Sequence, residues 1–357
     1  MTESNTILSV KNLDISFNLR GQRLRVIRDV SLDVYRDESL AIVGESGSGK
    51  SVFCKSLMGL LDANGALNSG SIYYDPGATV RPTAPARDLA QLKTDRDWQA
   101  YRGGEIAMVM QDPMTSLNPL KTIGAQIVEA IEINQRIRGK AAKSAAIGYL
   151  SDVGITEPQR RFHQFPHEFS GGMRQRVVIA IALACRPNIL ICDEPTTALD
   201  VTIEAQILTL IKSMKTKHQL TTIYITHDLG VVANVADRIV VMYAGDFIEI
   251  GTAEDIFYDP RHPYTWALLS SMPTNGVKGE DLYSIRGTPP NLFQTIHGDA
   301  FAPRNPAALK IDFVKRPPFF KVSDTHFART WLLDPRAPAV APPPVIQRAR
   351  TYTERAL

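Results

Sequence analysis

The segment at residues 44–51, GESGSGKS, constrains the fold of this chain more than any other. It fits the pattern G-x-x-x-x-G-K-[ST], in which successive backbone N–H groups surround a polyphosphate. The apolar run Ser39–Val43 before it predicts a buried strand, and residues 51–60 predict a helix whose N-terminus faces the anion. The alternative is a glycine-rich turn that matches by chance. Both flanks argue against it, because they are the context that the pattern requires.

Every residue of this loop is a candidate for phosphate binding: Gly44, Glu45, Ser46, Gly47, Ser48, Gly49, Lys50 and Ser51. The glycines allow positive φ and let the backbone approach the phosphates closely. Lys50 is expected to reach the β- and γ-phosphates as a compact point charge, and the hydroxyl of Ser51 to ligate Mg²⁺. The loop therefore predicts a site for a polyphosphate together with its metal ion.

Two carboxylates follow another apolar run. Residues 188–192 (NILIC) predict a buried strand that leads directly into Asp193 and Glu194. In enzymes with a phosphate loop, an acid at such a strand end assists the Mg²⁺. The carboxylate after it can take a proton from an attacking water and act as a general base. Solvated surface carboxylates are the alternative, and the apolar strand before them in a chain with a phosphate loop argues against it.

Gln111 and His227 stand at the ends of two further predicted strands, residues 105–110 and 222–226. In a parallel sheet the carboxyl ends of the strands face the ligand. Gln111 is therefore placed to reach Mg²⁺ or the attacking water, and His227 to bond a γ-phosphate or to hold Glu194. Each of the two, taken alone, is also explained as a structural residue at a strand end. The functional interpretation depends on the other motifs.

A second anion-binding helix start is predicted far from the first. Ser170 is a good N-cap, and Gly171 and Gly172 leave backbone N–H groups uncovered at the start of a helix over residues 173–185. An ordinary capped helix is the alternative. Phe17 lies at the end of the first predicted strand. Its ring could stack on a nucleobase, or it could simply be the apolar residue that ends the strand.

Other segments complete the expected framework. Strands are predicted at residues 7–17, 26–35 (joined by a turn around Gly21) and 71–74, and a hairpin at 237–243 and 247–251. Helices are predicted at 89–92, 122–153 (divided at Gly139), 201–218 and 263–271. Residues 64–70 look turn-rich, and 75–104 look like a variable surface insertion.

Composition is that of a globular protein with two domains: 357 residues, 44% hydrophobic and 22% charged. The net charge of +3 is too small to indicate a nucleic-acid partner. Cys54, Cys185 and Cys192 show no C-x-x-C spacing and are interpreted as reduced thiols of a cytosolic protein. No signal peptide is recognised, and the longest apolar run, residues 177–185, is too short to cross a bilayer. Work at a membrane would therefore need another chain as anchor.

Together these motifs resemble the ATP-binding subunit of an ABC transporter, over residues 7–251. The matches are residues 44–51 for Walker A, Gln111 for the Q-loop, FSGGM (169–173) for the signature, Cys192-Asp193-Glu194 for Walker B, Ala198-Leu199-Asp200 for the D-loop, His227 for the switch histidine and Phe17 for the adenine-stacking aromatic. Met173 replaces the usual glutamine of the signature, which leaves one contact to the partner's nucleotide in doubt.

The resemblance implies an α/β fold: a P-loop NTPase ABC cassette with a RecA-like mixed sheet core, an antiparallel β subdomain and a helical signature subdomain at about 113–187. It implies a cassette at 1–258, a small irregular C-terminal extension at 259–336 and a flexible basic tail at 337–357. ATP and Mg²⁺ are the implied cofactors, with Ser51, Gln111 and Asp193 on the metal. Glu194 is the implied base, with His227 and Gln111 beside it. Two cassettes would close head-to-tail, so that Ser170, Gly171, Gly172 and Asp200 serve the partner's ATP.

The stretches MVMQDPMTSLNP, DEPTTALDVTIEAQI and DPRHPYTWALLSSMP resemble the oligopeptide/dipeptide importer ATPases, with the closest likeness to the first ATPase subunit of Gram-positive oligopeptide systems. This implies a protein that hydrolyses ATP to power oligopeptide import. It would sit at the cytoplasmic face of the membrane in a heterodimer with a second ATPase subunit, together with two permease subunits and an extracytoplasmic peptide-binding protein.

Other functions remain open at this point. The same machinery could import dipeptides, nickel or glycosides. A soluble ABC ATPase of DNA repair or of the ribosome is disfavoured, because the chain has neither a long coiled-coil insertion nor a second cassette. A scaffold that binds ATP without turnover is disfavoured by Glu194 and His227.

The C-terminal extension departs from its relatives at four positions. Many of them carry cysteines for an iron–sulfur cluster in a pattern like GCxFAPRCPxAxxxC. Here the stretch reads GDAFAPRNPAALKID, so that Asp299, Asn305 and Asp312 replace three cysteines and Thr330 occupies the expected fourth place. No thiolate remains at these positions, and we predict no cluster. The extension is expected to stabilise the ATPase pair or to dock on the membrane subunits.

Overall fold

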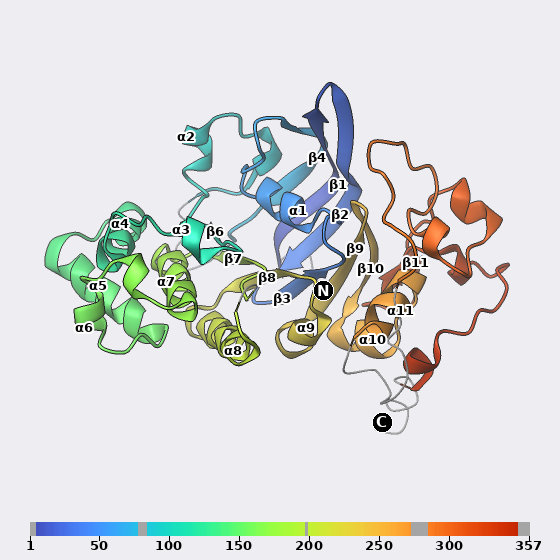
Figure 1. Cartoon of the computed structure of the whole chain (residues 1–357). Helices are drawn as coiled ribbons and strands as arrows, with labels where there is room; N and C mark the ends of the chain where they lie inside the picture. Colours follow the sequence, from blue (N-terminus) through green and yellow to red (C-terminus); the bar gives the residue numbers. More distant parts are fainter. Residues whose placement is uncertain (1–4, 78–83, 197–198, 273–284, 349–357) are drawn as a thin grey trace. The chain divides into compact units, whose positions relative to one another are not determined.

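The computed structural model describes residues 5–77, 84–196, 199–272 and 285–348 (Figure 1). The chain divides into two compact units. Residues 1–8, 33–39 and 73–225 form the first, and residues 9–32, 40–72 and 226–357 form the second. No helix within the described ranges has both the length and the apolar character needed to cross a membrane.

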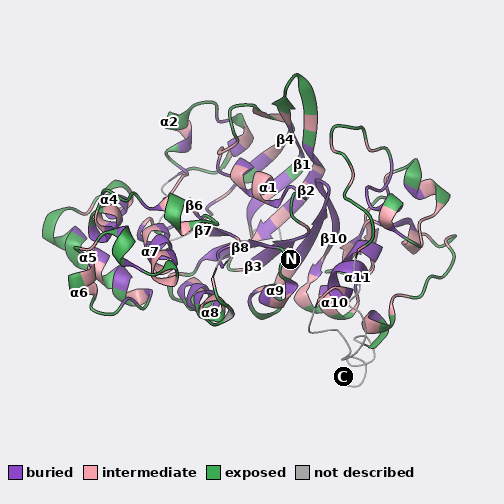
Figure 2. Cartoon of the chain, viewed as in Figure 1, coloured by how far each residue is buried: buried purple, intermediate pink, exposed green. Residues whose placement is uncertain are grey.

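The first unit contains a parallel arrangement of three strands, β6 (Ile106–Val109), β7 (Ile189–Asp193) and β8 (Thr221–Thr226). All residues of β7 and β8 are buried (Figure 2), which is why β7 begins with four apolar residues and β8 has an apolar centre between threonines. The predicted strands at 105–110, 188–192 and 222–226 are confirmed to within two residues at each end. The two-residue strand β5 (Arg87–Asp88) pairs with the end of β4.

Helices make up most of the rest of the first unit. The longer ones are α4 (Ile123–Gln135), α5 (Gly139–Asp152), α7 (Gly171–Ala184) and α8 (Val201–His218); the short ones are η2 (Leu89–Gln91), α2 (Asp95–Trp98), α3 (Pro113–Ser116), α6 (Pro158–Arg161) and η3 (Pro166–Glu168). The predicted division of this stretch into two helices at Gly139 is confirmed: α4 ends at Gln135, and Gly139, at φ 61°, is the first residue of α5. Arg136, which caps α4 with φ 56°, shares in the turn.

The second unit contains a sheet in the order β11-β12-β10-β9-β3. Its members are β3 (Ser39–Val43), β9 (Arg238–Tyr243), β10 (Asp246–Thr252), β11 (Phe320–Lys321) and β12 (Phe327–Ala328). β3 is parallel to β9, and the other pairs are antiparallel. The predicted hairpin of β9 and β10 is confirmed. Its turn residues, Ala244 and Gly245, have φ 47° and 80°, as a tight hairpin turn requires.

A second sheet of this unit has the order β2-β1-β4, with β1 (Thr6–Leu19), β2 (Gln22–Tyr35) and β4 (Gly65–Tyr74). Arg20 and Gly21, both at positive φ, form the predicted turn between β1 and β2. The prediction for residues 64–70 was wrong, since β4 already begins at Gly65. This polar, glycine-containing segment has low intrinsic strand preference and is extended because it pairs with β1.

The helices of the second unit are α1 (Lys50–Ser56), α9 (Leu229–Val235), α10 (Ala253–Tyr258), α11 (Pro263–Ser270), η5 (Ala302–Arg304), η6 (Lys310–Phe313) and η7 (Trp331–Leu333). Every residue of α11 is buried, so it belongs to the core of this unit. The predicted domain boundary at residue 258 and the limits of the helical subdomain stay predictions.

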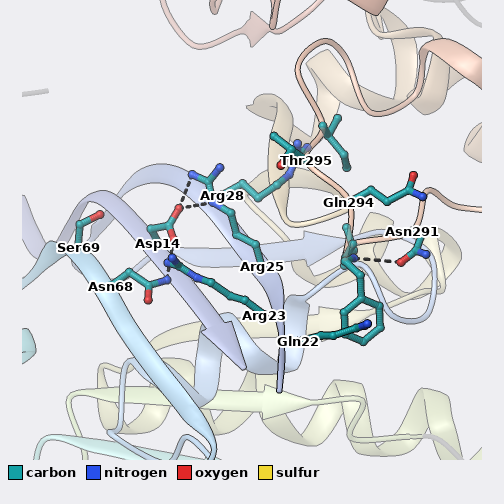
Figure 3. Close-up of a pocket in the computed structure, with 13 residues that line it drawn as sticks. Asp14, Gln22, Arg23, Arg25, Arg28, Asn68, Ser69, Asn291, Gln294 and Thr295 are labelled. Carbon is teal, nitrogen blue, oxygen red and sulfur yellow. Dashed lines mark hydrogen bonds and ion pairs between the residues drawn. The ribbon is translucent and has the colours of Figure 1, made fainter. Parts of the chain in front are cut away.

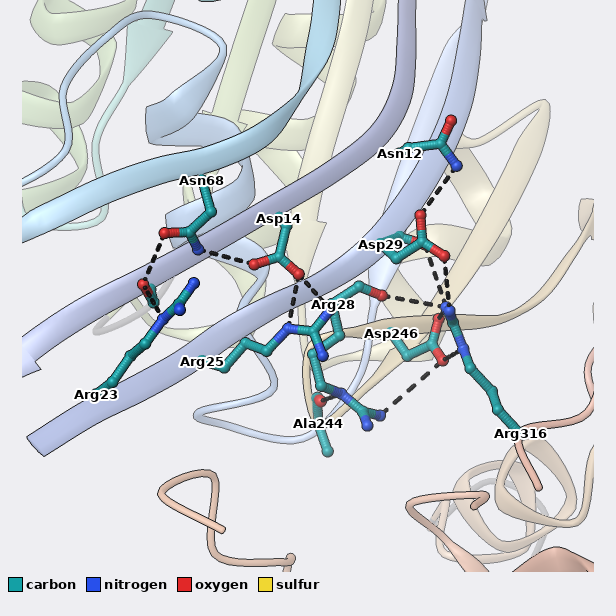
Figure 4. A network of polar contacts seen from close by, with 11 residues as sticks. Asn12, Asp14, Arg23, Arg25, Arg28, Asp29, Asn68, Ala244, Asp246 and Arg316 are labelled. Carbon is teal, nitrogen blue, oxygen red and sulfur yellow. Dashed lines mark hydrogen bonds and ion pairs between the residues drawn. The ribbon is translucent and has the colours of Figure 1, made fainter. Parts of the chain in front are cut away.

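An arginine from the C-terminal region attaches it to both sheets of the second unit. Figure 4 shows the guanidinium of Arg316 between Asp246 of β10 and Asp29 of β2. It donates to both carboxylate oxygens of Asp246, at 2.7 and 2.6 Å, and to Asp29 at 3.0 Å. Asp246 is buried, so this ion pair lies largely away from solvent.

The cysteines are free thiols, as the sequence predicted. Cys54 and Cys192 are buried and Cys185 is half-buried. Burial raises the pKa of Cys185 to about 11 and also raises that of Cys192. Both thiols are therefore held in the unreactive neutral form.

Candidate functional site

The predicted phosphate loop joins β3 to α1 within the second unit. A Cβ on Gly44 would lie 2.1 Å from the carbonyl oxygen of Met242, so only glycine fits beside β9 at this position. Gly49 has φ 106° and caps α1 without a side-chain hydrogen bond. The first N–H groups of α1 are therefore not occupied by a capping side chain, which is the arrangement that suits an anion.

Lys50 is buried and bends over the loop that precedes it. Its ammonium group donates to the carbonyl oxygens of Gly44 and Glu45, at 2.8 and 2.9 Å. The amide of Ser48 donates to Glu45 at 3.2 Å and tightens the same turn. The positive charge is thus held against two backbone carbonyls of the loop, and the role of Lys50 in phosphate binding stays a prediction.

In the first unit, the ends of β6 and β7 bring two predicted residues together. Gln111 follows β6, and its amide Nε2 donates to the carboxylate of Glu194 at 2.8 Å. Glu194 follows Asp193, the buried last residue of β7, and its own N–H donates to the carbonyl of Ile225 at 2.9 Å. Glu194 has φ 44°, an uncommon conformation for a residue other than glycine, and such positions concentrate at functional sites.

The predicted second helix start is exposed. Ser170 caps α7, its hydroxyl accepting the N–H of Met173 at 3.4 Å, and Ser170 and Gly171 face solvent. α7 begins two residues earlier than predicted. The two glycines differ in the space around them. A Cβ added to Gly172 would lie 2.7 Å from Ile203, whereas a Cβ added to Gly171 would lie 3.7 Å from its nearest neighbouring atom. Packing on α8 thus requires Gly172 to be glycine.

The remaining predicted residues are placed as follows. Asp200 caps α8 by accepting the N–H of Ile203 at 2.9 Å. Ala198, predicted in the D-loop, lies outside the described residues. His227 is exposed after β8, in the second unit, and its predicted interaction with Glu194 stays a prediction. Phe17 is half-buried with its ring against Gly65, where a Cβ would come within 2.7 Å of Cε1.

One contact of the phosphate loop was missed by the sequence analysis. Arg304, in the C-terminal extension, forms a bidentate ion pair with Glu45 at 2.8 and 3.0 Å. The hydroxyl of Tyr264 accepts the N–H of Glu45 at 2.8 Å. A signal for it existed, because a carboxylate within an anion-binding loop calls for a nearby cation.

The four positions of the missing cysteines are all buried and are used for local hydrogen bonds. Each side chain accepts a hydrogen bond from a backbone N–H two or three positions away. The pairs are Asp299 with Phe301, Asn305 with Ala307, Asp312 with Leu309, and Thr330 with Leu332. Within the described ranges, no group of three or more acidic, histidine or cysteine side chains is arranged to hold a metal ion. The predicted lack of a cluster stays a prediction that rests on the donor types.

A hollow of about 940 Å³ in the second unit is lined by Arg23, Arg25 and Arg28 of β2 and by residues 291–296 (Figure 3). These arginines already have partners within the protein. Arg25 donates to Asp14 at 2.6 Å, Arg23 to Ser16 at 3.0 Å and Arg28 to the carbonyl of Ala244 at 2.9 Å. The lining therefore gives no independent reason to assign a ligand.

Comparison with known proteins agrees with these features. The ABC transporter family matches residues 27–197, and the family described as "Oligopeptide/dipeptide transporter, C-terminal region" matches residues 248–311. The oligopeptide transport ATP-binding protein AmiE of Streptococcus pneumoniae is 54% identical over 344 residues, which cover 96% of this chain and 94% of AmiE. OppD of Bacillus subtilis is 53% identical (96% and 93% covered), and the dipeptide transport protein DppD of Lactococcus lactis 50% (94% and 93%).

Solved structures show the same fold. The dimeric ATP-binding cassette MJ0796 in a post-hydrolysis state with ADP and Pi superposes with a TM-score of 0.59 at 25% identity, over 69% of this chain and 98% of that one. The cbiO1 protein of Clostridium perfringens gives a TM-score of 0.58 at 26% identity, over 71% and 91%. The predicted α/β cassette fold is confirmed by these similarities.

Proposed function

This chain belongs to the ABC transporter family of ATP-binding proteins, and from that premise we propose that it hydrolyses ATP to power the import of oligopeptides. The oligopeptide cargo is supported by the AmiE and OppD relatives and by the match to the oligopeptide/dipeptide C-terminal region. Dipeptides are the second candidate, because DppD is nearly as similar. Nickel and glycosides have no comparable support among these relatives.

The phosphate loop and α1 bind the triphosphate of ATP. The uncapped first turn of α1 offers backbone N–H donors, and the ammonium of Lys50 exchanges its carbonyl partners for phosphate oxygens. Phe17 stacks on the adenine, a role compatible with its half-buried ring. Ser51, Gln111 and Asp193 are suited to hold Mg²⁺, since hydroxyl, amide and carboxylate oxygens are its preferred ligands. When bound, the metal neutralises charge on the β- and γ-phosphates.

Glu194 acts as the general base. The observation that carries this role is the 2.8 Å hydrogen bond from Gln111, which fixes the orientation of the carboxylate. Gln111 is then a positioning residue that joins the base to the nucleotide, because the oxygen of the same amide remains the end suited to Mg²⁺. His227 is proposed to hold the γ-phosphate or Glu194 once ATP is bound.

The complete ATP site requires a second cassette. Ser170 and Gly171 offer an exposed helix start, at the beginning of α7. We assign these residues, with Gly172 and Asp200, to the ATP of a second ATPase subunit in a head-to-tail pair. Two permease subunits and an extracytoplasmic peptide-binding protein complete the transporter at the cytoplasmic face of the membrane. Loss of the γ-phosphate releases the pair and resets the permease.

Uptake of a labelled four- to six-residue peptide by cells tests this proposal. Cells with Glu194→Gln are expected to lose uptake while the protein still binds ATP, because the amide cannot accept the proton. Glu254→Gln, the same change at an exposed residue of α10, should leave uptake unchanged. Equal peptide uptake by the unsubstituted protein and Glu194→Gln would contradict the assigned base. If the cells import dipeptides but not longer peptides, the protein powers dipeptide import, the second candidate function.

A further inference from the structure

Arg304 of the C-terminal extension contacts the phosphate loop through a buried ion pair. Its side chain is 5% exposed, and that of Glu45 is 24% exposed. Its two terminal nitrogens each bond one oxygen of the Glu45 carboxylate, the planar geometry that makes arginine–carboxylate pairs strong. The guanidinium also donates to the hydroxyl of Tyr243 at 3.1 Å and to the carbonyl of Arg286 at 2.9 Å. The group is thus fixed from several directions.

The position of Glu45 gives this pair its significance. Glu45 is the second residue of a loop whose remaining groups, the backbone N–H donors and Lys50, suit a polyanion. An unpaired carboxylate there would repel the phosphates, and burial weakens the screening of such a repulsion by water. Tyr264 also occupies the N–H of Glu45, so this residue faces the extension with both its side chain and its amide.

We propose that Arg304 cancels the charge of Glu45 and thereby makes the phosphate loop competent to bind polyphosphates. This makes nucleotide affinity depend on the extension being docked on the loop. Arg304 acts through Glu45 and is a positioning residue, not a catalytic one. The inference rests on the proposed function, because it takes the ligand of the loop to be ATP.

The experiment compares the dissociation constant for ATP among charge variants of the full-length protein. Calorimetric titrations are made in the Glu194→Gln background, so that ATP is not consumed. Arg304→Met keeps an unbranched apolar side chain but leaves Glu45 uncompensated, and is expected to weaken ATP binding about tenfold, or ~1.4 kcal/mol. Glu45→Gln leaves an extra positive charge and should bind ATP at least as tightly. The double variant should recover most of the affinity lost in Arg304→Met.

This order of affinities separates charge cancellation from simple support of the loop. If the pair served only to hold the loop in shape, both single variants would weaken binding and the double variant would not recover it. That pattern, or an unchanged affinity of Arg304→Met, would overturn the inference. The loss should also be larger for ATP than for AMP, because the repulsion grows with the charge of the ligand.

Two controls keep the test decisive. Arg286→Met removes an exposed arginine of the same extension, whose carbonyl and not its side chain contacts Arg304, and should leave ATP affinity unchanged. Arg304→Lys retains a cation without the bidentate geometry, and it is the variant to titrate if thermal denaturation shows Arg304→Met to be unfolded. Its loss of ATP affinity should be smaller than the tenfold expected of Arg304→Met. Failure of the unsubstituted protein to bind ATP would refute the proposed function. Normal binding by every variant would refute only the role of Arg304.

Discussion

Replacing Arg316 by methionine is expected to lower the free energy of unfolding by about 3 kcal/mol. The guanidinium makes five hydrogen bonds, three to the carboxylates of Asp246 and Asp29 and two to the carbonyls of Arg28 and Asp29. Without it, the carboxylate of Asp246, whose side chain is 6% exposed, has Arg28 and Arg329 as its nearest cations among the described residues, at 3.9 and 3.8 Å. Removing one partner of a buried pair costs about 3–5 kcal/mol, and the 27% exposure of Arg316 favours the low end.

Denaturant titration of the full chain, followed by circular dichroism, measures this loss. Arg336→Met is the matched control: Arg336 pairs with Asp334 at the surface with an 86% exposed side chain, so its replacement should leave the unfolding midpoint unchanged. The double variant Arg316→Met/Asp246→Asn should cost less than the sum of the two single losses, because both substitutions remove the same ion pair. Equal midpoints for Arg316→Met and Arg336→Met would refute the reasoning.

Two further predictions concern packing and pH. Gly172→Ala is expected to destabilise the protein by about 1–2 kcal/mol, because its Cβ would overlap Ile203. Gly171→Ala should not destabilise it, because there is room for a Cβ at that position. Thermal denaturation of both variants measures the difference, and equal losses of stability would contradict the packing argument. Burial raises the pKa of Asp299 to about 7 from an ordinary 3.8, so its contribution to stability is present below about pH 4 and is lost as the pH rises through 7. Asp299→Asn should therefore be more stable than the parent at pH 8 and lose this advantage at pH 4. If the melting temperatures of variant and parent differ by the same amount at both pH values, the titration of Asp299 is not the cause.

The parts of the site that the sequence predicted are those governed by local rules. Buried parallel strands read as short apolar runs, so β3, β7 and β8 were found together with the polar residues at their carboxyl ends. The 2.8 Å contact of Gln111 with Glu194 follows from the same geometry, since β6 and β7 are neighbours in register.

The parts that were missed depend on contacts distant in the sequence. Arg304 and Glu45 are 259 positions apart, and no periodicity relates them. Residues 65–70, the first part of β4, were missed because pairing with β1, and not residue preference, extends them. Between α4 and α5, Gly139 was recognised as the division, but the positive φ of Arg136 was not, because that conformation is typical of glycine.

The C-terminal extension illustrates how a small segment can be held without a metal cluster. The side chains of Asp299, Asn305, Asp312 and Thr330 each close one local turn, but none of these bonds links segments far apart in the chain. Long-range attachment comes from the pairing of β12 with β10, from Arg316, which bonds β2 and β10, and from Arg304, which bonds the phosphate loop. Because these arginines contact different parts of the second unit, their effects should separate. Loss of Arg316 should reduce stability more than ATP affinity, and loss of Arg304 should do the reverse, so the extension would contribute to both the stability and the nucleotide affinity of this ATPase.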